Sequence, residues 1–315
     1  MSGHNIVFMG TPEFAIPSLR ALVDAGYNIR GVVTQPDRPK GRGKKLSPSP
    51  VKEAALAMRL EVVTPTTVKD QAFINWLQDR KPEIIVVVAF GRILPQTVLD
   101  FPPHGCINVH ASLLPEYRGA APIHWAVIHG KPMSGVTTMM ISLALDSGDV
   151  LLRESVPISD EMTSGELHDT LKNIGAELLV RTLDQEFAGK LTRIIQDETK
   201  VTYAPPLTRT LERIDWSKSA IEIHNLVRGL NPWPGAYCKL SDLTLKIWKT
   251  NVVTHDDNQS ESVPGRIRAV TACGLLVETG SDLIELKEIQ PESKRRMSAT
   301  ECACGYCLNP GIILE

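Results

Sequence analysis

Short apolar runs alternate with segments of helical spacing through the first half of the chain. The runs at residues 6–9, 29–33 and 84–89 predict buried strands. Apolar residues with the spacing of an amphipathic helix lie between and after them, at 19–23, 54–60 and 73–77. Residues 84–89 are apolar without alternation, which is typical of a strand covered by helices on both faces. The pattern predicts an α/β domain with an open parallel sheet of Rossmann type.

A long amphipathic helix ends the first part of the chain, and Thr163 and Glu166 form the capping box that opens it. The pattern changes after residue 203, where residues 203–207 have the composition of a linker. Ser219 and Glu222 then mark one further helix. Short runs rich in β-formers follow at close spacing, at 243–248, 265–270, 275–278 and 283–289. They predict a small β-barrel, so we expect two domains, residues 1–205 and 206–315.

Composition narrows the class of protein. A chain of 315 residues with 43% hydrophobic and 22% charged residues is typical of a two-domain globular protein. The longest apolar run, 84–90, is far shorter than a membrane span, and no secretion signal precedes the first strand. We therefore expect a cytoplasmic protein with reduced thiols and no membrane partner. With 34 Lys and Arg against 36 Asp and Glu, a wholly basic nucleic-acid binder is excluded, but a local basic site is not.

Several cofactor signatures are absent from the sequence. No G-x-G-x-x-G follows the first strand, and neither a phosphate-binding P-loop motif nor H-E-x-x-H occurs. Cys302, Cys304 and Cys307 have a metal-like spacing, but no histidine follows to complete a zinc set. The better interpretation is three incidental thiols, and we expect no metal.

The residues best suited to chemistry are Asn108 and His110. Residues two apart in a strand share a face, and these two end a predicted strand, where open α/β sheets bind ligands. An amide donor beside an imidazole suits addition to a carbonyl, because one group binds the developing oxyanion while the other moves a proton. Asp146, on a predicted turn, would orient His110 and favour its charged form. Taken alone, each feature is more often ordinary hydrogen bonding or turn chemistry, and no Ser or Cys is set as a nucleophile.

The combination of motifs resembles the folate-dependent formyltransferase family. The match consists of Asn108-Val-His-Ala-Ser-Leu-Leu-Pro115, Tyr117-Arg-Gly119 and Leu145-Asp-Ser-Gly148. Further matching segments lie at 9–14, 34–46, 196–199, 214–216 and 231–234, so the resemblance covers residues 5 to about 290. Ala111 stands where the family commonly has glycine, and the ending 301–307 departs from the usual tail. The resemblance implies a Rossmann-like domain followed by an OB-like barrel.

The resemblance also implies a reaction. A formyl group passes from 10-formyltetrahydrofolate to the α-amino group of methionyl initiator tRNA, without a metal and without a covalent enzyme intermediate. Asn108 and protonated His110 would stabilise the oxyanion, and Asp146 would relay protons. Folate would lie against Ser112, Leu113, Leu114 and Pro115, flanked by Phe90, Gly91, Ile93 and Leu94. For Leu113 and Leu114 plain core packing is an equal alternative.

A basic loop supports the tRNA assignment. Arg38, Lys40, Arg42, Lys44 and Lys45 are opposed only by Asp37, and glycines and prolines between 36 and 50 predict a loop without regular structure. Such an arm suits phosphate contacts in the acceptor stem, with Arg42 foremost, whereas the ordinary alternative is a solvated charged loop. Arg209, Arg213 and residues 294–296 would add backbone contacts. We expect a monomer.

Other functions share parts of these motifs. A sugar-nucleotide amine formyltransferase has the same core but no use for the basic loop. A formyltetrahydrofolate hydrolase would use water in place of the amine. Glycinamide ribonucleotide formyltransferase is a shorter single domain and leaves 206–315 unexplained. A non-enzymatic RNA-binding protein would leave Asn108, His110 and Asp146 without a purpose.

Overall fold

The computed structural model describes residues 3–40, 45–254 and 262–315. The chain divides into two compact units. The first contains residues 1–119, 134–156 and 168–204, and the second contains 120–133, 157–167 and 205–315. The division into two folding domains at residue 205 stays a prediction.

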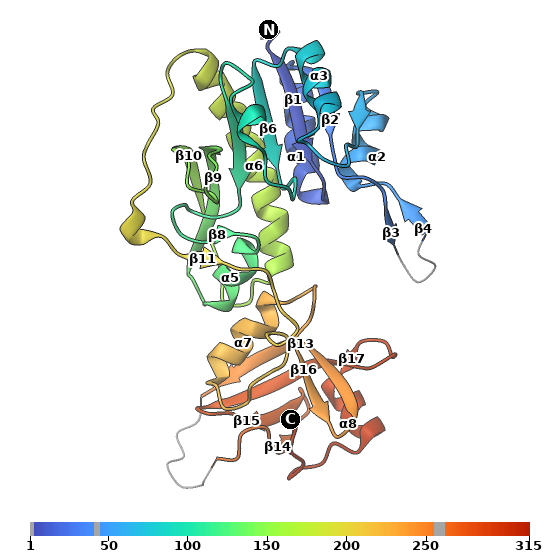
Figure 1. The fold of residues 1–315 in the computed structure, drawn as a ribbon. Coiled ribbons are helices and arrows are strands. Elements are labelled where there is room, and N and C mark those ends of the chain that lie inside the picture. Colours follow the sequence, from blue (N-terminus) through green and yellow to red (C-terminus); the bar gives the residue numbers. More distant parts are fainter. Residues whose placement is uncertain (1–2, 41–44, 255–261) are drawn as a thin grey trace. The chain divides into compact units, whose positions relative to one another are not determined.

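The main sheet of the first unit has the strand order β10-β9-β7-β6-β1-β2-β5 (Figure 1). Its strands are β1 (Asn5–Gly10), β2 (Asn28–Val33), β5 (Val62–Val63), β6 (Ile84–Val88), β7 (Cys106–His110), β9 (Met133–Met140) and β10 (Val150–Pro157). Pairing is parallel from β5 through β2, β1 and β6 to β7, and β9 joins β7 antiparallel. The predicted Rossmann-like open sheet is confirmed.

Helices follow these strands, and some of them begin at a polar cap. The helices are α1 (Ile16–Asp24), α2 (Pro50–Ala57), α3 (Gln71–Arg80), α4 (Gln96–Leu99) and α6 (Ser164–Phe187), with a 3-10 turn at Glu13–Ala15. The side chain of Asp70 accepts a hydrogen bond from the backbone N–H of Phe73 at 2.8 Å. Before α6, Thr163 and Glu166 exchange side-chain-to-backbone hydrogen bonds of 2.8 and 3.2 Å, so the predicted capping box is confirmed.

Both faces of the sheet are covered, which explains the apolar strands. Val7, Ile85 and Cys106 lie in one buried cluster with Phe73 and Leu77 of α3. On the opposite face, a Cβ placed on Gly175 of α6 would lie 3.1 Å from Val109. Since side chains alternate along a strand, Asn108 and His110 continue the row that Cys106 begins, beyond the end of that cluster.

The second unit is built on a curled antiparallel sheet of order β12-β13-β16-β15-β14, with β17 beside β16. Its strands are β12 (Tyr237–Leu240), β13 (Leu243–Val253), β14 (Ile267–Val270), β15 (Leu275–Glu278), β16 (Leu283–Pro291) and β17 (Met297–Ser298). Register shifts between β13 and β16 bend the pair, as bulges do. The predicted small barrel is thus confirmed in the form of a half-barrel.

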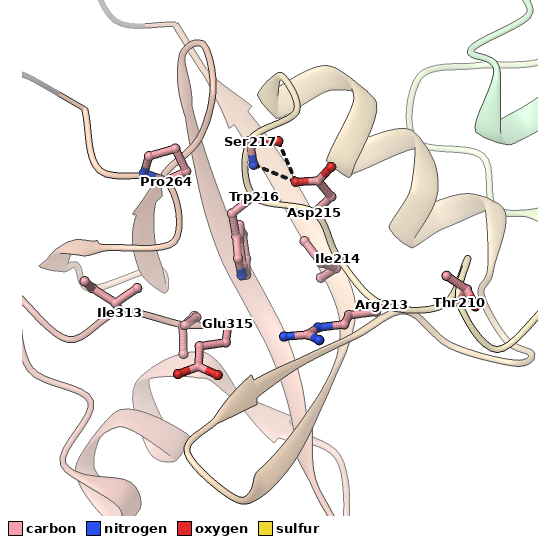
Figure 2. A pocket seen from close by; sticks show the side chains of 10 residues that line it. Thr210, Arg213, Ile214, Asp215, Trp216, Ser217, Pro264, Ile313 and Glu315 are labelled. Atoms are coloured by element: carbon pink, nitrogen blue, oxygen red, sulfur yellow. Dashed lines mark hydrogen bonds between the residues drawn. The ribbon is translucent and has the colours of Figure 1, made fainter.

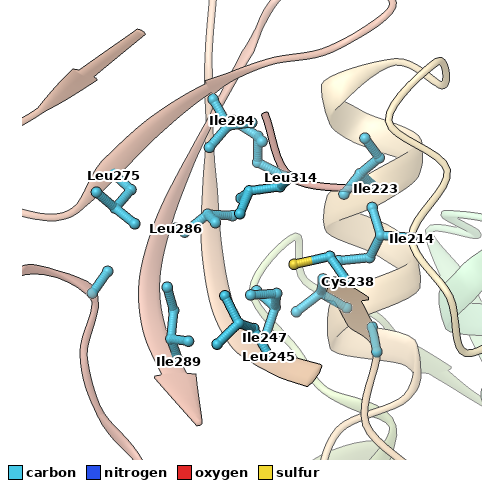
Figure 3. Close-up of a cluster of buried hydrophobic side chains, with 14 of the residues drawn as sticks. Ile214, Ile223, Cys238, Leu245, Ile247, Leu275, Ile284, Leu286, Ile289 and Leu314 are labelled. Atoms are coloured by element: carbon cyan, nitrogen blue, oxygen red, sulfur yellow. The ribbon is translucent and has the colours of Figure 1, made fainter. Parts of the chain in front are cut away.

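Helices complete the second unit, and two of them, the last two in the chain, pack on the half-barrel. The helices are α5 (Pro122–Ile128), α7 (Ala220–Gly229) and α8 (Ala299–Tyr306). The predicted capping box of Ser219 and Glu222 opens α7. Figure 3 shows the core, in which Ile223 of α7 faces Leu286 and other apolar side chains of the sheet, all fully buried. Among the helices of the described residues, none combines the length and apolar character needed to cross a bilayer.

The basic loop differs from its prediction. Residues Arg38–Lys40 form β3 and Lys45–Ser47 form β4, and the two strands pair antiparallel, so the expectation of no regular structure is wrong there. Both strands of a two-stranded ribbon are edge strands. Proline is tolerated in an edge strand because its missing N–H can fall on the unpaired side, and Pro39 of β3 fits this rule. Arg42 and Lys44 lie outside the described residues.

Candidate active site

Asn108 and His110 end β7 at the carboxyl edge of the sheet. Asn108 pairs with Val87 of β6, and His110 pairs with Thr137 of β9. The chain order switches direction between β1 and β6, and ligands of open α/β sheets bind outside the strand ends near such a point. Asn108 is half-buried, and its side-chain amide makes no hydrogen bond to the described residues. Its donors are therefore free for a bound molecule.

Each ring nitrogen of His110 faces an oxygen atom of a neighbouring residue. Only 6% of the residue is exposed. Nε2 lies 3.0 Å from the carbonyl oxygen of Tyr117, and because a carbonyl can only accept, Nε2 carries a hydrogen. Nδ1 faces Oδ2 of Asp146 at 3.7 Å, which is too long for a hydrogen bond. An imidazolium in this position has a charged partner and an Nδ1–H that is still free to donate.

Asp146 reaches His110 from the turn that follows β9. Its backbone has φ 47°, in the left-handed region, and its carboxylate is fixed by the N–H of Gly119, which donates to Oδ2 at 2.8 Å. Gly119 itself has φ 125°, and a Cβ there would come within 2.7 Å of the Ala204 carbonyl oxygen. Only glycine brings this N–H so close. The structure therefore brings all three predicted catalytic residues to one edge, with the Asn108 amide on the same strand face as His110.

The segment 112–115 is fixed by its own hydrogen bonds. Thr137 Oγ1 donates to the Ser112 carbonyl at 2.7 Å and accepts from the Leu114 N–H at 3.1 Å. Ser112 Oγ donates to the Glu116 carbonyl at 2.6 Å. The side chain of Leu114 is buried in a small cluster with Met139 and Val150, as the core-packing alternative has it. Leu113 and Pro115 are half-buried beside it.

The predicted folate-flanking residues divide into two groups. Phe90 and Leu94 are buried in the cluster below the sheet, whereas Gly91 is exposed and Ile93 is 79% exposed. Sequence reasoning gave no role to two side chains that hold this loop. Thr11 Oγ1 donates to the Phe90 carbonyl at 3.0 Å, and Gln35 Nε2 donates to it at 2.9 Å.

The base of the basic hairpin contacts the same loop. Arg38 is exposed, and its guanidinium donates to Oε1 of Gln35. Gln35 Nε2 in turn donates to the Gly91 carbonyl at 3.2 Å. In the backbone register of the hairpin, Lys40 of β3 pairs with Lys45 of β4. Asp37, the single acid of this segment, is paired with Lys52 of α2 at 2.8 Å.

Three of the basic residues predicted in the second unit have protein partners. Arg296 stacks over the Trp248 ring at 3.6 Å, and Arg209 lies 4.8 Å over the ring of Tyr237. Arg295 forms an ion pair of 2.6 Å with Glu301. The ring contacts cover one face of the Arg296 and Arg209 guanidinium groups, and Arg209 also pairs with Glu212 at 2.5 Å.

A depression of about 540 Å³ lies in the second unit. Figure 2 shows the Trp216 ring among Arg213, Ile313 and Glu315. Trp216 Nε1 is buried without a hydrogen-bond partner in the described residues. Asp215 accepts from Ser217 Oγ at 2.6 Å and from its N–H at 3.0 Å, and these bonds lower the pKa of its carboxyl. The lining mixes polar and apolar side chains, and we assign it no chemistry.

The cysteines near the end lie on and just after α8. Cys302 is buried, and burial raises the pKa of its thiol to about 11, while Cys304 and Cys307 are exposed. In the part of the chain that the structure describes, no group of three His, Cys, Asp or Glu side chains is placed to hold a metal.

Comparison with known proteins gives the family. The family model described as "Formyl transferase" matches residues 4–183, and "Formyl transferase, C-terminal domain" matches 206–307. A protein of Acetivibrio thermocellus named methionyl-tRNA formyltransferase is 49% identical over 309 residues, which are 98% of this chain and 99% of that protein. One of the same name from Moorella thermoacetica is 50% identical over 98% of both chains.

Solved structures share the fold at low identity. The N-formyltransferase from Helicobacter canadensis, in complex with folinic acid and dTDP-3-aminofucose, is 17% identical, with a TM-score of 0.65 over 90% of this chain and 99% of that chain. HypX from Aquifex aeolicus, in complex with tetrahydrofolic acid, is 16% identical, with a TM-score of 0.62 over 96% of this chain and 47% of that chain. The two domain models and the full-length relatives show that this chain belongs to the formyl transferase family and is a formyl-transferring enzyme.

Proposed function

We propose that this enzyme transfers the formyl group of 10-formyltetrahydrofolate to the α-amino group of methionyl initiator tRNA. One observation carries the proposal: the Asn108 amide, which has no hydrogen-bond partner among the described residues, lies on the same strand face as a histidine that is set between the Tyr117 carbonyl and the Asp146 carboxylate. The relatives that match over nearly the whole chain are named methionyl-tRNA formyltransferase, which supports the acceptor.

The residues beside this pair suit a flat heteroaromatic donor. Gly91 is exposed, and a Cβ there would lie 2.8 Å from Gln35 Nε2. A side chain at this position would therefore clash with Gln35, and with glycine the backbone stays accessible to a ligand. The exposed apolar side chain of Ile93 adjoins it. We assign the pterin ring to this loop and to the segment 112–115. When bound, the donor supplies a formyl group activated by its attachment to the N10 nitrogen.

Asn108 acts on the formyl oxygen, and His110 acts on the departing nitrogen. As the neutral amine attacks the formyl carbon, the carbonyl π electrons move to oxygen, and the Asn108 N–H donates to the negative charge that forms. His110 keeps its Nε2–H on the Tyr117 carbonyl, so its free donor is Nδ1–H. That donor faces Asp146 at 3.7 Å, and we assign to it the proton that the departing nitrogen takes up.

Asp146 balances the proton transfers. The attacking amine must lose one proton, and the departing nitrogen must gain one. Asp146, directly or through a water, accepts the first, and His110 gives the second from Nδ1. The proton then passes across the 3.7 Å between them, which returns the pair to its starting state. The net reaction makes an N-formyl amine and tetrahydrofolate, with no bond to the protein at any step.

Three further parts of the proposal concern the partners of the enzyme. The basic hairpin, with Arg38 at its base and the predicted contacts Lys40, Arg42, Lys44 and Lys45, binds tRNA phosphates. We assign the reaction to the cytoplasm, where initiator tRNA is used. We also propose that the enzyme works as a monomer that needs no metal.

Acceptor competition tests this function. Purified enzyme is incubated with 10-formyltetrahydrofolate and, in separate reactions, initiator methionyl-tRNA, a dTDP-amino sugar or buffer alone. We expect tetrahydrofolate release to be stimulated by the tRNA only. Stimulation by the amino sugar would replace the acceptor with a sugar nucleotide, and equal release in buffer alone would make the protein a hydrolase.

A further inference from the structure

The segment of residues 194–204, which follows α6, connects the two loops that hold His110. At one end, Ile194 pairs with Val150, just after the Asp146 turn, through backbone hydrogen bonds of 2.8 and 2.9 Å. At the other end, β11 (Tyr203–Ala204) pairs with β8 (Arg118–Gly119), which follows the Tyr117 carbonyl. Figure 1 shows this segment, in yellow, running past β10 to reach β8. We call residues 194–204 the strap.

Gln196 is the strap residue that reaches the Asp146 turn. Its Nε2 donates to the carbonyl oxygens of Asp146 and Gly148, both at 2.8 Å. Its Oε1 accepts from Nε and Nη2 of Arg118 at 3.1 and 2.9 Å. The side-chain amide thus uses both donors and both acceptor positions. Swapping its oxygen and nitrogen would set an oxygen against two carbonyls, so the partners fix its orientation.

Both members of this contact are buried. Gln196 is 5% exposed and Arg118 is 3% exposed. Arg118 also forms an ion pair with Glu198 of the strap at 2.8 Å, so its guanidinium is anchored from two sides. The amide hydrogen that follows Arg118, that of Gly119, is the one that fixes the Asp146 carboxylate. Gln196 and Arg118 therefore hold both the backbone and the side chain of Asp146.

The strap also fixes the other partner of His110. Thr202 Oγ1 accepts from the Tyr117 N–H at 2.9 Å, and the Thr202 carbonyl accepts from the Arg118 N–H at 2.9 Å. Tyr117 has φ 60° and Asp146 has φ 47°, so both residues that face His110 stand in the left-handed region, which costs free energy unless neighbours hold it.

We propose that Gln196, held by Arg118, is a positioning residue that keeps the Asp146 carboxylate in line with Nδ1 of His110. The inference rests on the proposed function, because it gives Gln196 its effect through the proton transfers of that reaction. Gln196 touches neither substrate. Its loss lowers the rate of the chemical step and leaves the binding of both substrates in place.

Two substitutions of Gln196 test the proposal. Gln196→Met keeps the length of the side chain and removes every hydrogen bond. Gln196→Glu keeps the contact with Arg118, and so the fold, but an ionised carboxylate cannot donate to the two carbonyls. The matched control is Asp197→Asn, the next residue, which is exposed and whose bonds among the described residues lie within its own turn and to Lys200. For each protein, active sites are counted by tetrahydrofolate titration, and the urea midpoint is measured.

Per folate-binding site, we expect kcat of both Gln196 variants to fall by at least about threefold and by up to about 100-fold, as for a misplaced catalytic group. KM for tRNA and for the folate donor should stay within about twofold, and Asp197→Asn should match wild type. A kcat per site within about threefold of wild type in Gln196→Glu would overturn the proposal. So would a loss that only follows the fraction of protein that binds folate, since that is the sign of a purely structural role.

A double-mutant cycle separates action through Asp146 from a general effect. In single turnovers with excess enzyme, Gln196→Glu in an Asp146→Asn background should cost less than about twofold, because the group it positions is already lost. Full additivity would contradict the proposal. Wild-type protein that transfers no formyl group to methionyl initiator tRNA would refute the proposed function instead, so the two failures are distinguishable.

Discussion

Replacing Asn108 with alanine gives the most informative single perturbation of the site. The amide ends β7, is half-buried and makes no hydrogen bond to the described residues. Its removal therefore leaves no buried protein group without a partner, in contrast to loss of His110, which holds the Tyr117 carbonyl. We expect the free energy of unfolding of Asn108→Ala to stay within about 1 kcal/mol of wild type.

The expected effect on catalysis is much larger. If the free amide donates to the formyl oxygen as its charge develops, its loss should cost about 2.7–4 kcal/mol of transition-state stabilisation, or about 10²–10³-fold in kcat. Because the neutral formyl oxygen of the bound substrate accepts a weaker hydrogen bond than the oxyanion does, KM should change little.

Single-turnover transfer of a labelled formyl group measures this loss directly. The matched control is Asn28→Ala at the amino end of β2, whose exposed amide donates to Asn5 Oδ1 at 2.7 Å, and it should match wild type. A kcat for Asn108→Ala within about threefold of wild type would refute the oxyanion role. A rise in KM without a fall in kcat would show that Asn108 contributes only to ground-state binding.

Further predictions concern proton transfer, the core, pH and tRNA. His110→Gln keeps a donor but cannot pass a proton, so kcat should fall by about 10²–10⁴-fold in the same single-turnover assay; an unaltered pH–rate profile would contradict its role. Leu286→Ala empties a fully buried position in the half-barrel and should cost about 2–5 kcal/mol in urea unfolding, while a cost near zero would mean that the site is not packed. The hydrogen bonds from His4 and the Asn5 N–H lower the pKa of Glu83, so this carboxylate stabilises the fold above its unfolded-state pKa and loses that effect as the pH falls through its folded-state pKa. The destabilisation by Glu83→Gln should therefore be seen near neutral pH and vanish in acid, and a constant difference would contradict this assignment. Arg38→Ala should raise KM for tRNA and reduce the slope of its salt dependence by about one unit, with kcat unchanged, and an unchanged slope would argue against a phosphate contact.

Much of this fold follows from local sequence signals. Thr163 with Glu166 and Ser219 with Glu222 predict the starts of α6 and α7, because a capping box satisfies the same N–H groups in any context. Helix α8 went unpredicted although Ser298 accepts from the Glu301 N–H at 3.1 Å, the same signature. The cysteines and glycine that follow lack the helical spacing of apolar residues that would predict a helix.

The site follows from the sequence only in part. Asn108 and His110 share a face by strand alternation alone, and their place at the carboxyl edge follows from the topology. The hydrogen bond of Gln196 with Asp146 joins residues 50 positions apart. The polar residues around Gln196 have no local pattern that predicts this contact. The same holds for Gln35, which reaches the Phe90 carbonyl from 55 positions away. Such contacts depend on the finished fold.

The most direct test of formyl transfer to initiator methionyl-tRNA compares two acceptors under one set of conditions. Purified protein and labelled 10-formyltetrahydrofolate are mixed with initiator methionyl-tRNA or with elongator methionyl-tRNA, and the formylated aminoacyl-tRNA is counted. We expect label on the initiator alone, with none in either reaction when Asn108, His110 and Asp146 are all replaced by alanine. Label on neither tRNA in the wild-type reaction, with tetrahydrofolate nevertheless released, would contradict it.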